Sequence, residues 1–561
     1  MNGELSQKRF AFGVTALTLS VIAVKVIGLI YKIPLLKILG AEGMGYFNAA
    51  YELYALFFVI STAGLPVAVS ILISESLAAG RGRNIERIHK ISFAIFCLLG
   101  IVGSLLMAVG ASAFSGLLES PKARLAILAI SPTVFFICIS GAMRGYFQGG
   151  QNMQPTAISQ VIEAVGKLVL GLVFAVLAKR AGNDASVCAA YAALGLTAGS
   201  LLSMLYLLLT KHFSRFACPS TALLTDTDPS KTILKRLLLL AVPVTLSSSL
   251  SGLTRVIDMS MILRRLQTTG YESSVAAAMY GCYSTLAVPV YNIPSSLVAG
   301  ISLSLVPILT AVAERGDREK GSELVISSLK MCLFLSVPCS VGMAMFAKPI
   351  LSLLFVGEEG SVAVAAPLLT VLAFSVCSSC LMGITNAVLQ AYKKAMLPIF
   401  SMLVGTAVKI LSAYILTGIP EIGMQGAAIS TLLCNTSSVG MNLYFIDRHT
   451  GAQFHILKLS IPPMMASFLS VGFSFAVWCL LARRLSSGIG LLVSILLCIL
   501  LYLWIGGKMG VYTEREVRML PYGDKLAGLL LALGLIKKEK RKDIEHEQRG
   551  YHQRASFQKQ I

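Results

Sequence analysis

Residues 17–31 read LTLSVIAVKVIGLIY and residues 243–261 read PVTLSSSLSGLTRVIDMSM, two apolar runs that each contain one cation. The two cations are Lys25 and Arg255. A charged side chain at the centre of a bilayer costs about 3 kcal/mol or more, so such residues usually face a wet or protein-lined interior. Lys167 and Lys409 lie in similar apolar surroundings. We therefore expect these cations to line a pathway for an anionic passenger.

The composition indicates a polytopic membrane protein, because 56% of the residues are hydrophobic and only 13% are charged. Soluble domains have about 25% charged residues. Apolar windows long enough to span a membrane cover residues 10–31, 46–74, 91–114, 125–147, 156–178, 187–210, 237–262, 276–311, 326–347, 362–391, 397–418, 424–446, 459–482 and 489–507. The expected fold is all-α, with about fourteen transmembrane helices.

The distribution of Lys and Arg predicts the orientation. If the N-terminus is cytoplasmic, roughly 20 basic residues fall on the cytoplasmic side before the tail is counted, against roughly 11 on the other side. An even number of helices then also places the C-terminus in the cytoplasm. The tail contains KKEKRK at 537–542 after a short apolar stretch, so it is predicted either as an interfacial helix on anionic lipid or as a solvated basic tail.

Other classes of function lack a sequence signal. The net charge of +20 needs no nucleic-acid partner, because much of it sets the topology and the tail lacks interleaved aromatics. Cys377 and Cys380 form a CSSC motif, but no neighbouring histidine supports a metal site, so we interpret them as packing residues. No nucleophile motif, P-loop or dinucleotide fingerprint is found. We expect neither an enzyme nor a bound cofactor or metal.

The two halves of the chain resemble each other. Gln148 precedes Lys167 by 19 residues in FQGGQNMQPTAISQVIEAVGKL, and Gln390 precedes Lys409 by the same 19 in LQAYKKAMLPIFSMLVGTAVKIL. Each segment has a proline between its Gln and its Lys. The second segment follows the first by 242 positions, which predicts an internal repeat.

Two weaker matches support the repeat. Glu75 and Glu314 end apolar runs 239 positions apart, and the cation-Val-Ile sequences at Lys25 and Arg255 lie 230 positions apart. Both copies would begin in the cytoplasm, so the predicted repeats are parallel. Lys25 would then face Arg255 across a central cavity, and Lys167 would face Lys409.

The repeat predicts the domain organisation. It consists of a six-helix lobe at 1–235, a second six-helix lobe at 236–455, two additional helices at 456–508 and a basic cytoplasmic tail at 509–561.

Three segments resemble the polysaccharide transporter branch of the MATE-like flippase superfamily, which includes stage V sporulation proteins and lipid II flippases. They are VKVIGLIYKIPLLKILGAEGMGYFNAAYELY, AGLPVAVSILISE and MRGYFQGGQNMQPTAISQVIE, the last being the most specific. The resemblance covers roughly residues 1–505. It implies a MATE-like pair of lobes around a central cavity that flips an undecaprenyl-linked sugar outward by alternating access.

The resemblance also implies cavity arginines on the first, second and eighth helices. Lys25 matches the first-helix arginine. A second first-helix position holds Tyr31, with Lys32 beside it, and the second-helix position falls near Phe58. The eighth-helix segment YSTLAVPVYNIP has no arginine. The predicted cavity cations are therefore Lys25, Arg255, Lys167, Lys409 and Lys32, and lipid II is not assigned as the only substrate.

Several of these cations have an alternative interpretation within their own helix. Arg255 could pair with Asp258, and Lys167 with Glu163, because residues three or four apart share a helical face. Glu52 could bind a coupling cation, recognise sugar or neutralise Lys25.

Asp258 and Glu163 are further candidates for coupling to Na⁺ or H⁺, alongside the membrane potential. The uncharged polar residues of the second half either bind sugar or tie helices together; they are Asn292, Asn386, Gln390 and Asn435.

The sequence thus predicts a flippase in the bacterial plasma membrane. Its cargo would be an undecaprenyl-pyrophosphate-linked glycan, either lipid II or another polysaccharide precursor, and its partners membrane lipids and cell-wall synthesis enzymes. A MATE-type multidrug or cation antiporter is the alternative, and it should present carboxylates and aromatics without surplus buried cations. A membrane scaffold would have no use for a duplicated cation pattern.

Overall fold

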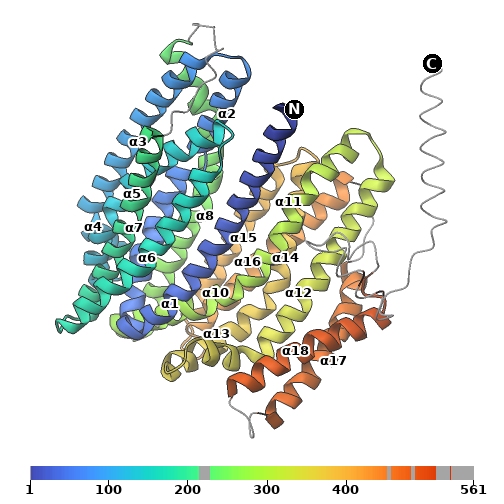
Figure 1. The fold of residues 1–561 in the computed structure, drawn as a ribbon. Coiled ribbons are helices and arrows are strands. Elements are labelled where there is room, and N and C mark those ends of the chain that lie inside the picture. The colour runs from blue at the N-terminus through green and yellow to red at the C-terminus, as the bar shows by residue number, and fades with distance from the viewer. Residues whose placement is uncertain are drawn as a thin grey trace, which may run out of the picture. The chain divides into compact units, whose positions relative to one another are not determined.

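The computed structural model describes residues 2–213, 228–450, 456–481 and 487–512, with residues 528 and 531 in addition. Within these ranges every regular element is a helix, as Figure 1 shows. The helices are α1 (Asn2–Thr62), α2 (Leu65–Ala78), α3 (Gly82–Val109), α4 (Ala111–Leu117), η1 (Pro121–Ala123), α5 (Arg124–Gly149), α6 (Gln154–Arg180), α7 (Ala185–Phe213), α8 (Ser230–Thr268), α9 (Ser273–Cys282), η2 (Tyr283–Ala287), α10 (Val288–Tyr291), α11 (Ile293–Glu314), α12 (Arg318–Leu354), α13 (Glu359–Phe374), α14 (Val376–Ala391), α15 (Met396–Leu416), α16 (Gln425–Thr450), α17 (Ile456–Leu481) and α18 (Ser487–Lys508). The predicted all-α class is confirmed.

Each of the fourteen predicted windows falls on one or more of these helices. Among the described residues, nine helices are long and apolar enough to cross a membrane, or ten if α13 and α14, bent by 45°, form one span. The chain is therefore a multi-pass membrane protein, while the number of fourteen crossings stays a prediction. The basic tail segment 537–542 lies outside the described residues.

The long helix α1 contains two helical segments, because Gly40 interrupts it with a φ of 70° and a ψ of 175°. A positive φ is readily available to glycine and costs other residues energy. A continuous helix of 61 residues would be about 90 Å long, about three times the thickness of a hydrocarbon core. The break at Gly40 divides this length into two segments, which we call the first and second segments of α1.

The chain divides into two compact units, each described here by itself. Unit 1 comprises residues 1–289, 354–365 and 410–427, and unit 2 comprises residues 290–353, 366–409 and 428–561. Unit 1 thus includes α8 and α9, which the repeat places at the start of the second half. The predicted lobe boundaries at 235 and 455 follow the repeat and stay a prediction.

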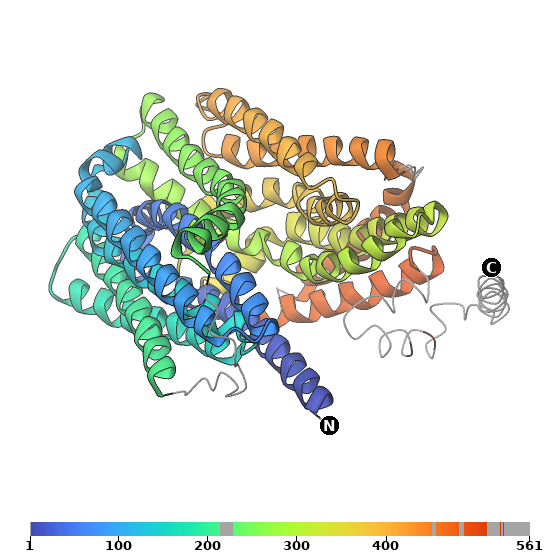
Figure 2. The same cartoon turned by 90° about the horizontal axis from the view of Figure 1, so that it is seen from above.

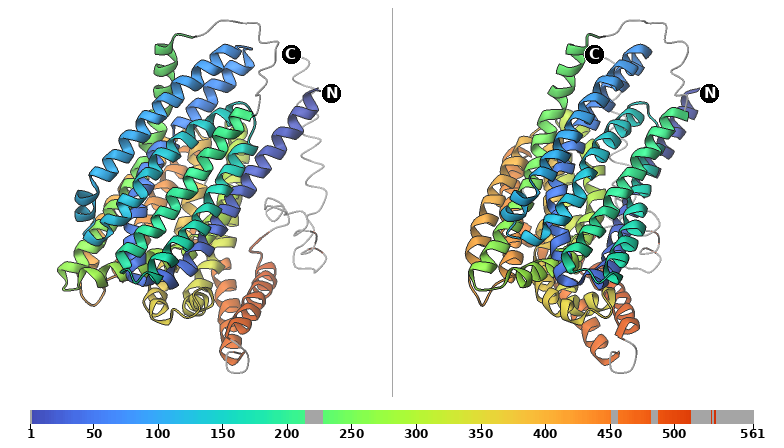
Figure 3. Two further views of the ribbon diagram at one scale, coloured as in Figure 1. Left: turned by 60° about the vertical axis from the view of Figure 1, so that its left-hand side comes forward. Right: turned by 90° about the vertical axis from the view of Figure 1, so that its left-hand side faces the viewer.

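Unit 1 is a bundle in which α6 packs on α7, α7 on α5, and α5 on α3, and these helices run side by side in Figures 2 and 3. Both segments of α1 contribute large buried side chains, among them Tyr31, Leu35 and Tyr46, each at most 2% exposed. Other faces stay apolar at the surface, such as Leu105 and Val109 on α3. Such faces are expected of helices whose solvent is lipid.

In unit 2, α17 and α18 pack against each other and against α12. The contact is a cluster of Phe346, Val471 and Leu491, each at most 3% exposed, with Trp478 packed beside it. Burial of an aliphatic or aromatic side chain contributes about 1.5–3 kcal/mol. The cluster therefore accounts for the attachment of α17 and α18 to this unit.

The α5–α6 and α14–α15 turns have the same backbone geometry, as the predicted repeat requires. Gln151 and Lys393, 242 positions apart, both have a φ of 60°. The Gln151 N–H donates to the carbonyl of Gln148, and the Lys393 N–H donates to the carbonyl of Gln390, both at 2.9 Å. The helices on either side also end and begin 242 positions apart.

The turns between α2 and α3 and between α11 and α12 correct one match within the repeat. The left-handed glycines there are Gly80 and Gly316, and α3 and α12 begin at residues 82 and 318, so the offset is 236. Glu75 and Glu314, 239 positions apart, are therefore not equivalent. A glutamate at the end of an apolar run is common and is therefore a poor marker of equivalent positions. A glycine with a positive φ is a better marker, because the conformation of the turn requires it.

We predict that Gln151→Gly stabilises the protein by about 0.5–1 kcal/mol. A left-handed conformation costs a non-glycine residue about 1–2 kcal/mol, which exceeds the entropy that glycine adds to the unfolded chain. Thermal unfolding in detergent, with Gln154→Gly at the first residue of α6 as the control, measures the effect. A melting temperature that falls as much for Gln151→Gly as for the control would contradict it.

Candidate functional site

The second segment of α1 lies unusually close to α9. A Cβ atom on Gly45 would approach the carbonyl oxygen of Ala277, and one on Gly281 would approach that of Ala41, each closer than side chains allow. Glycine at both positions lets the two backbones meet. This crossing places the residues that follow Gly281 against α1.

The close crossing brings a short π-helical segment, η2, against two polar side chains of α1. Asn48 Nδ2 donates to Ser284 Oγ and Thr285 Oγ1, both at 2.8 Å. Lys32 Nζ donates to the carbonyl oxygen of Ser284 at 2.9 Å. A π-helical turn shifts the hydrogen-bonding register of the helix and is frequent at functional sites. Here the π-helical turn contains Ser284, whose carbonyl oxygen accepts the hydrogen bond from Lys32.

Lys167, on α6, lies over two tyrosine rings of α1. Its Nζ is 4.6 Å from the ring centroid of Tyr51 and 5.3 Å from that of Tyr31. Lys167 thus lies over the residue that precedes Lys32, which brings both predicted cations to the same stretch of α1. Within the described residues, the contacts of the two ammonium groups are with a carbonyl oxygen and aromatic rings, not with a carboxylate at ion-pair distance.

Arg255 and Glu52 connect α8 with the second segment of α1. Arg255 Nε is 3.4 Å from Glu52 Oε2, and the two side chains are 50% and 21% exposed. Asp258, the partner considered within the same helix, is buried at 9% exposure. The contact with Glu52 is one that sequence spacing could not indicate, because the two residues lie on different helices.

Glu163 pairs with Arg144, which the sequence analysis did not identify as a site residue. Arg144 Nη2 lies 2.8 Å from Glu163 Oε2, with side chains 11% and 22% exposed. The same guanidinium donates to Ser159 Oγ at 3.0 Å and to Ser203 Oγ at 3.1 Å, so it joins α5, α6 and α7. Its position near the end of the predicted window 125–147 concealed it, although an arginine in an apolar run is itself a signal.

The other predicted residues lie elsewhere. Lys25 is exposed on the first segment of α1, seven positions before Lys32 and so on the same helical face. Lys409 is half-buried on α15, near Tyr291. Asn292 is exposed before α11, where its carbonyl accepts a hydrogen bond from Ser296. Lys167 belongs to unit 1 and Lys409 to unit 2, so their pairing stays a prediction.

In unit 2, uncharged residues tie the helices together, which supports one of the two interpretations of these side chains. Asn435 Nδ2 donates to Tyr291 Oη at 2.8 Å and to Ser375 Oγ at 2.9 Å. Asn442 Nδ2 donates to Asn386 Oδ1 at 2.8 Å. Asn386 lies 242 positions after Arg144, so an amide in unit 2 replaces a charge in unit 1.

Five of the nine predicted site residues thus gather in one part of unit 1, formed by α1, α6, α8 and η2, which we call the unit 1 cluster. They are Lys32, Glu52, Lys167, Asp258 and Arg255, and the described structure adds Tyr31, Asn48, Tyr51, Ser284 and Thr285. Glu163, which lies one turn from Lys167 on α6, connects the cluster to Arg144 through an ion pair. Among the described residues no group of three or more His, Cys, Asp or Glu side chains is placed to hold a metal ion.

A bundle of apolar helices with charged side chains gathered between them is expected of a membrane transport protein. The model of the family described as "Polysaccharide biosynthesis protein" matches residues 10–313, and the MatE model matches residues 243–415. The chain belongs to the polysaccharide biosynthesis protein family.

The chain is similar to two proteins of Bacillus subtilis (strain 168) over most of their length. Stage V sporulation protein B is 26% identical over 430 residues, which cover 76% of this chain and 81% of that protein. Lipid II flippase MurJ is 22% identical over 537 residues, which cover 91% and 97%. A solved structure of lipid II flippase MurJ in an inward closed conformation superposes with a TM-score of 0.66 at 16% identity, covering 88% of this chain and 98% of that one. This structural likeness establishes the fold.

Proposed function

We propose that this protein flips an undecaprenyl-pyrophosphate-linked glycan from the inner to the outer leaflet of the bacterial plasma membrane by alternating access. The glycan is lipid II or another polysaccharide precursor. The family and the named activity of a relative, lipid II flippase MurJ, support a lipid-linked sugar as the cargo. The cationic residues of the unit 1 cluster support an anionic cargo.

The observation that carries the proposal is that Lys32 and Lys167 both approach the stretch of α1 around Tyr31, with no carboxylate at ion-pair distance among the described residues. These two ammonium groups, from α1 and α6, lie within apolar helices, which costs free energy unless negative charge offsets them. The tyrosine rings beside Lys167 offset part of this cost, since a cation–π contact contributes about 0.5–2 kcal/mol. A diphosphate would offset more, because its oxygens accept charge-assisted hydrogen bonds from both lysines.

The remaining charges have proposed roles around that anion. Arg255 offers two parallel N–H groups to phosphate oxygens when it leaves Glu52, as guanidinium geometry allows. Lys25 would extend the cationic face of α1 by two turns, and Lys409 would receive the headgroup in unit 2. Asn292 would contact sugar hydroxyls.

The energy source and the surroundings of the protein complete the proposal. Glu52, Glu163 and Asp258 are the candidates for linkage to Na⁺ or H⁺, because a carboxylate can exchange its cationic partner for a coupling ion. The membrane potential would also act on a charged cargo. Both termini would lie in the cytoplasm, and cell-wall synthesis enzymes would supply and consume the lipid.

The second candidate is a MATE-type antiporter for organic cations. The MatE model match over residues 243–415 and the buried Asp258 favour it. Such a transporter would bind its cargo through carboxylates. The positive charges of Lys32 and Lys167 would instead repel an entering cation.

We predict that the double variant Lys25→Ala/Arg255→Ala abolishes glycan-lipid flipping in proteoliposomes while the protein still folds and inserts. The matched control is Lys37→Ala/Lys235→Ala, which removes exposed cations from the same two helices, α1 and α8. The control should flip at the wild-type rate. Unchanged flipping by a well-expressed Lys25→Ala/Arg255→Ala protein would contradict the assignment of these residues.

A further inference from the structure

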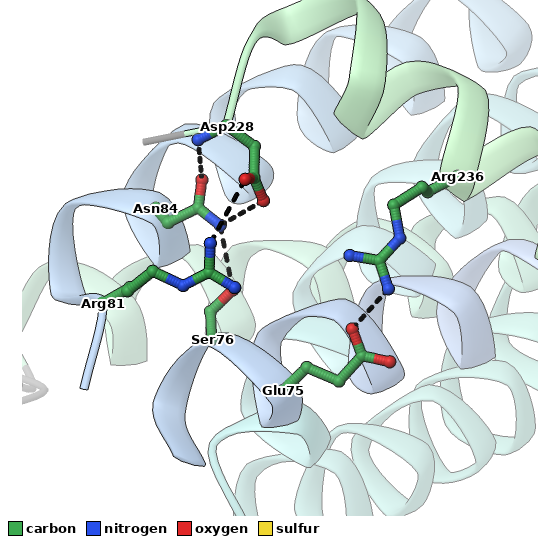
Figure 4. A network of polar contacts seen from close by, with 6 residues as sticks. All are labelled: Glu75, Ser76, Arg81, Asn84, Asp228 and Arg236. Atoms are coloured by element: carbon green, nitrogen blue, oxygen red, sulfur yellow. Dashed lines mark hydrogen bonds and ion pairs between the residues drawn. The ribbon is translucent and has the colours of Figure 1, made fainter. Parts of the chain in front are cut away.

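A buried polar network joins the end of α2, the start of α3 and the residue that leads into α8, as Figure 4 shows. At its centre Asn84, fully buried, donates through Nδ2 to Asp228 Oδ2 at 3.0 Å and accepts from the Asp228 N–H at 3.1 Å. Arg81 Nη1 lies 3.2 Å from Asp228 Oδ1. Asn84 also donates to Ser76 Oγ at 3.1 Å. Asp228 is thereby held by both its side chain and its backbone.

Two further contacts strengthen this attachment along the first turns of α8. Arg236 Nη2 lies 2.6 Å from Glu75 Oε2, with both side chains about half exposed. Arg87 donates to Ser230 Oγ at 3.0 Å. Beneath them Ile233 and Leu237 are at most 2% exposed. Polar and apolar contacts together therefore fix the beginning of α8 to α2 and α3.

The network lies at the charged end of α8. Helix α8 has 39 residues, so it is about 58 Å long and extends beyond a hydrocarbon core of about 30 Å. Its first turns contain Lys231, Lys235 and Arg236, and the apolar sequence follows them. Hydrogen bonds and ion pairs at this end can therefore form and break without placing charge in lipid.

The second half of the chain does not reproduce the network. At the offset of 236 that relates the two turns, the counterparts of Ser76, Arg81 and Asn84 are Val312, Asp317 and Lys320. These residue types differ from those that hold Asp228. The backbone of the turn is thus duplicated, whereas its polar side chains are specific to the site where α8 begins.

We propose that Asn84 and Asp228 anchor α8, the first helix of the second repeat, to α2 and α3, so that α8 moves with unit 1 during transport. This inference rests on the proposed function for its transport consequence only. It agrees with the division of the chain, in which unit 1 continues through α8 to Pro289. The anchor keeps the backbone of α8, which carries Arg255, with unit 1 throughout the cycle.

The test exchanges the amide and the carboxylate. Asn84→Asp places two carboxylates together and breaks the anchor through like-charge repulsion, whereas Asn84→Asp/Asp228→Asn again pairs one amide with one carboxylate. Glu86→Gln, which removes an exposed charge from the same turn of α3, is the control. Two quantities are measured in the full-length protein in nanodiscs or liposomes: amide hydrogen exchange of residues 230–242 and the rate of glycan-lipid flipping.

We expect Asn84→Asp to raise exchange at the start of α8 about tenfold or more and to lower flipping about tenfold or more, since a lost hydrogen bond exposes the helix to local opening. The exchanged pair should restore both quantities, and exchange in α5–α7 should stay unchanged. Wild-type exchange at 230–242 in Asn84→Asp would overturn the anchor, and so would faster exchange with wild-type flipping. Because exchange needs no cargo, a wild-type protein that flips no glycan lipid would refute the proposed function and leave the anchor to be judged by exchange alone.

Discussion

Glycan-lipid flipping falls about 100-fold in the double variant Lys32→Gln/Lys167→Gln, which retains hydrogen-bonding side chains and removes both charges. A charge-assisted hydrogen bond contributes about 1.5–3 kcal/mol, so the loss of two reduces binding of the transported anion by about 3 kcal/mol, or about 100-fold. Each single variant should lose about tenfold. The measurement is the initial flipping rate in proteoliposomes at matched protein content.

The control for this prediction removes cations that lie outside the cluster. Lys37→Gln and Lys179→Gln remove exposed charges from α1 and α6, the same two helices that provide Lys32 and Lys167. This pair should flip at the wild-type rate. A folded Lys32→Gln/Lys167→Gln protein that flips within about threefold of wild type would show that the two ammonium groups do not bind the cargo.

The second large effect concerns stability. Arg144→Leu should destabilise the protein by about 3 kcal/mol, because removing one partner of a buried ion pair leaves the other charge without compensation. The pair is 11% and 22% exposed, so we expect the lower end of the usual range. Thermal unfolding in detergent, followed by loss of the monodisperse peak, measures the change.

Two further variants separate charge from packing at this position. Arg144→Leu/Glu163→Leu removes both charges and should recover most of the lost stability, since apolar replacements of a buried pair are often close to neutral. Asn386→Leu changes the equivalent position of unit 2 and should cost about 1 kcal/mol, as expected for one hydrogen bond. If Arg144→Leu and Asn386→Leu were equally mild, the ion pair would not be structural.

Much of the fold could be predicted because hydropathy determines membrane helices almost residue by residue. Helix α5 spans 124–149, and the window of 125–147 came within two residues of each end. The repeat was detectable at Gln148 and Gln390 because the turns that follow these residues have the same length and the same backbone geometry. Gly40 was not recognised, since a single positive φ leaves no trace in an apolar pattern.

The partners of the charged residues could not be predicted from spacing. Spacing alone makes Asp258 a candidate partner of Arg255 and Glu163 a candidate partner of Lys167, because each pair lies three or four residues apart in one helix. The structure shows two further contacts, of Glu52 with Arg255 and of Arg144 with Glu163, each between different helices. Such contacts depend on how neighbouring helices are rotated and how closely they cross, which one helix's sequence does not specify.

The most direct test of the central claim uses the wild-type protein alone. Purified protein in liposomes is supplied in parallel with lipid II, with a simpler undecaprenyl-pyrophosphate sugar and with a cationic dye, and movement across the bilayer is scored for each. If the protein is a glycan-lipid flippase, we expect movement of one or both lipid-linked sugars and no movement of the dye. Dye movement without movement of either lipid-linked sugar would contradict it and would identify a cation antiporter.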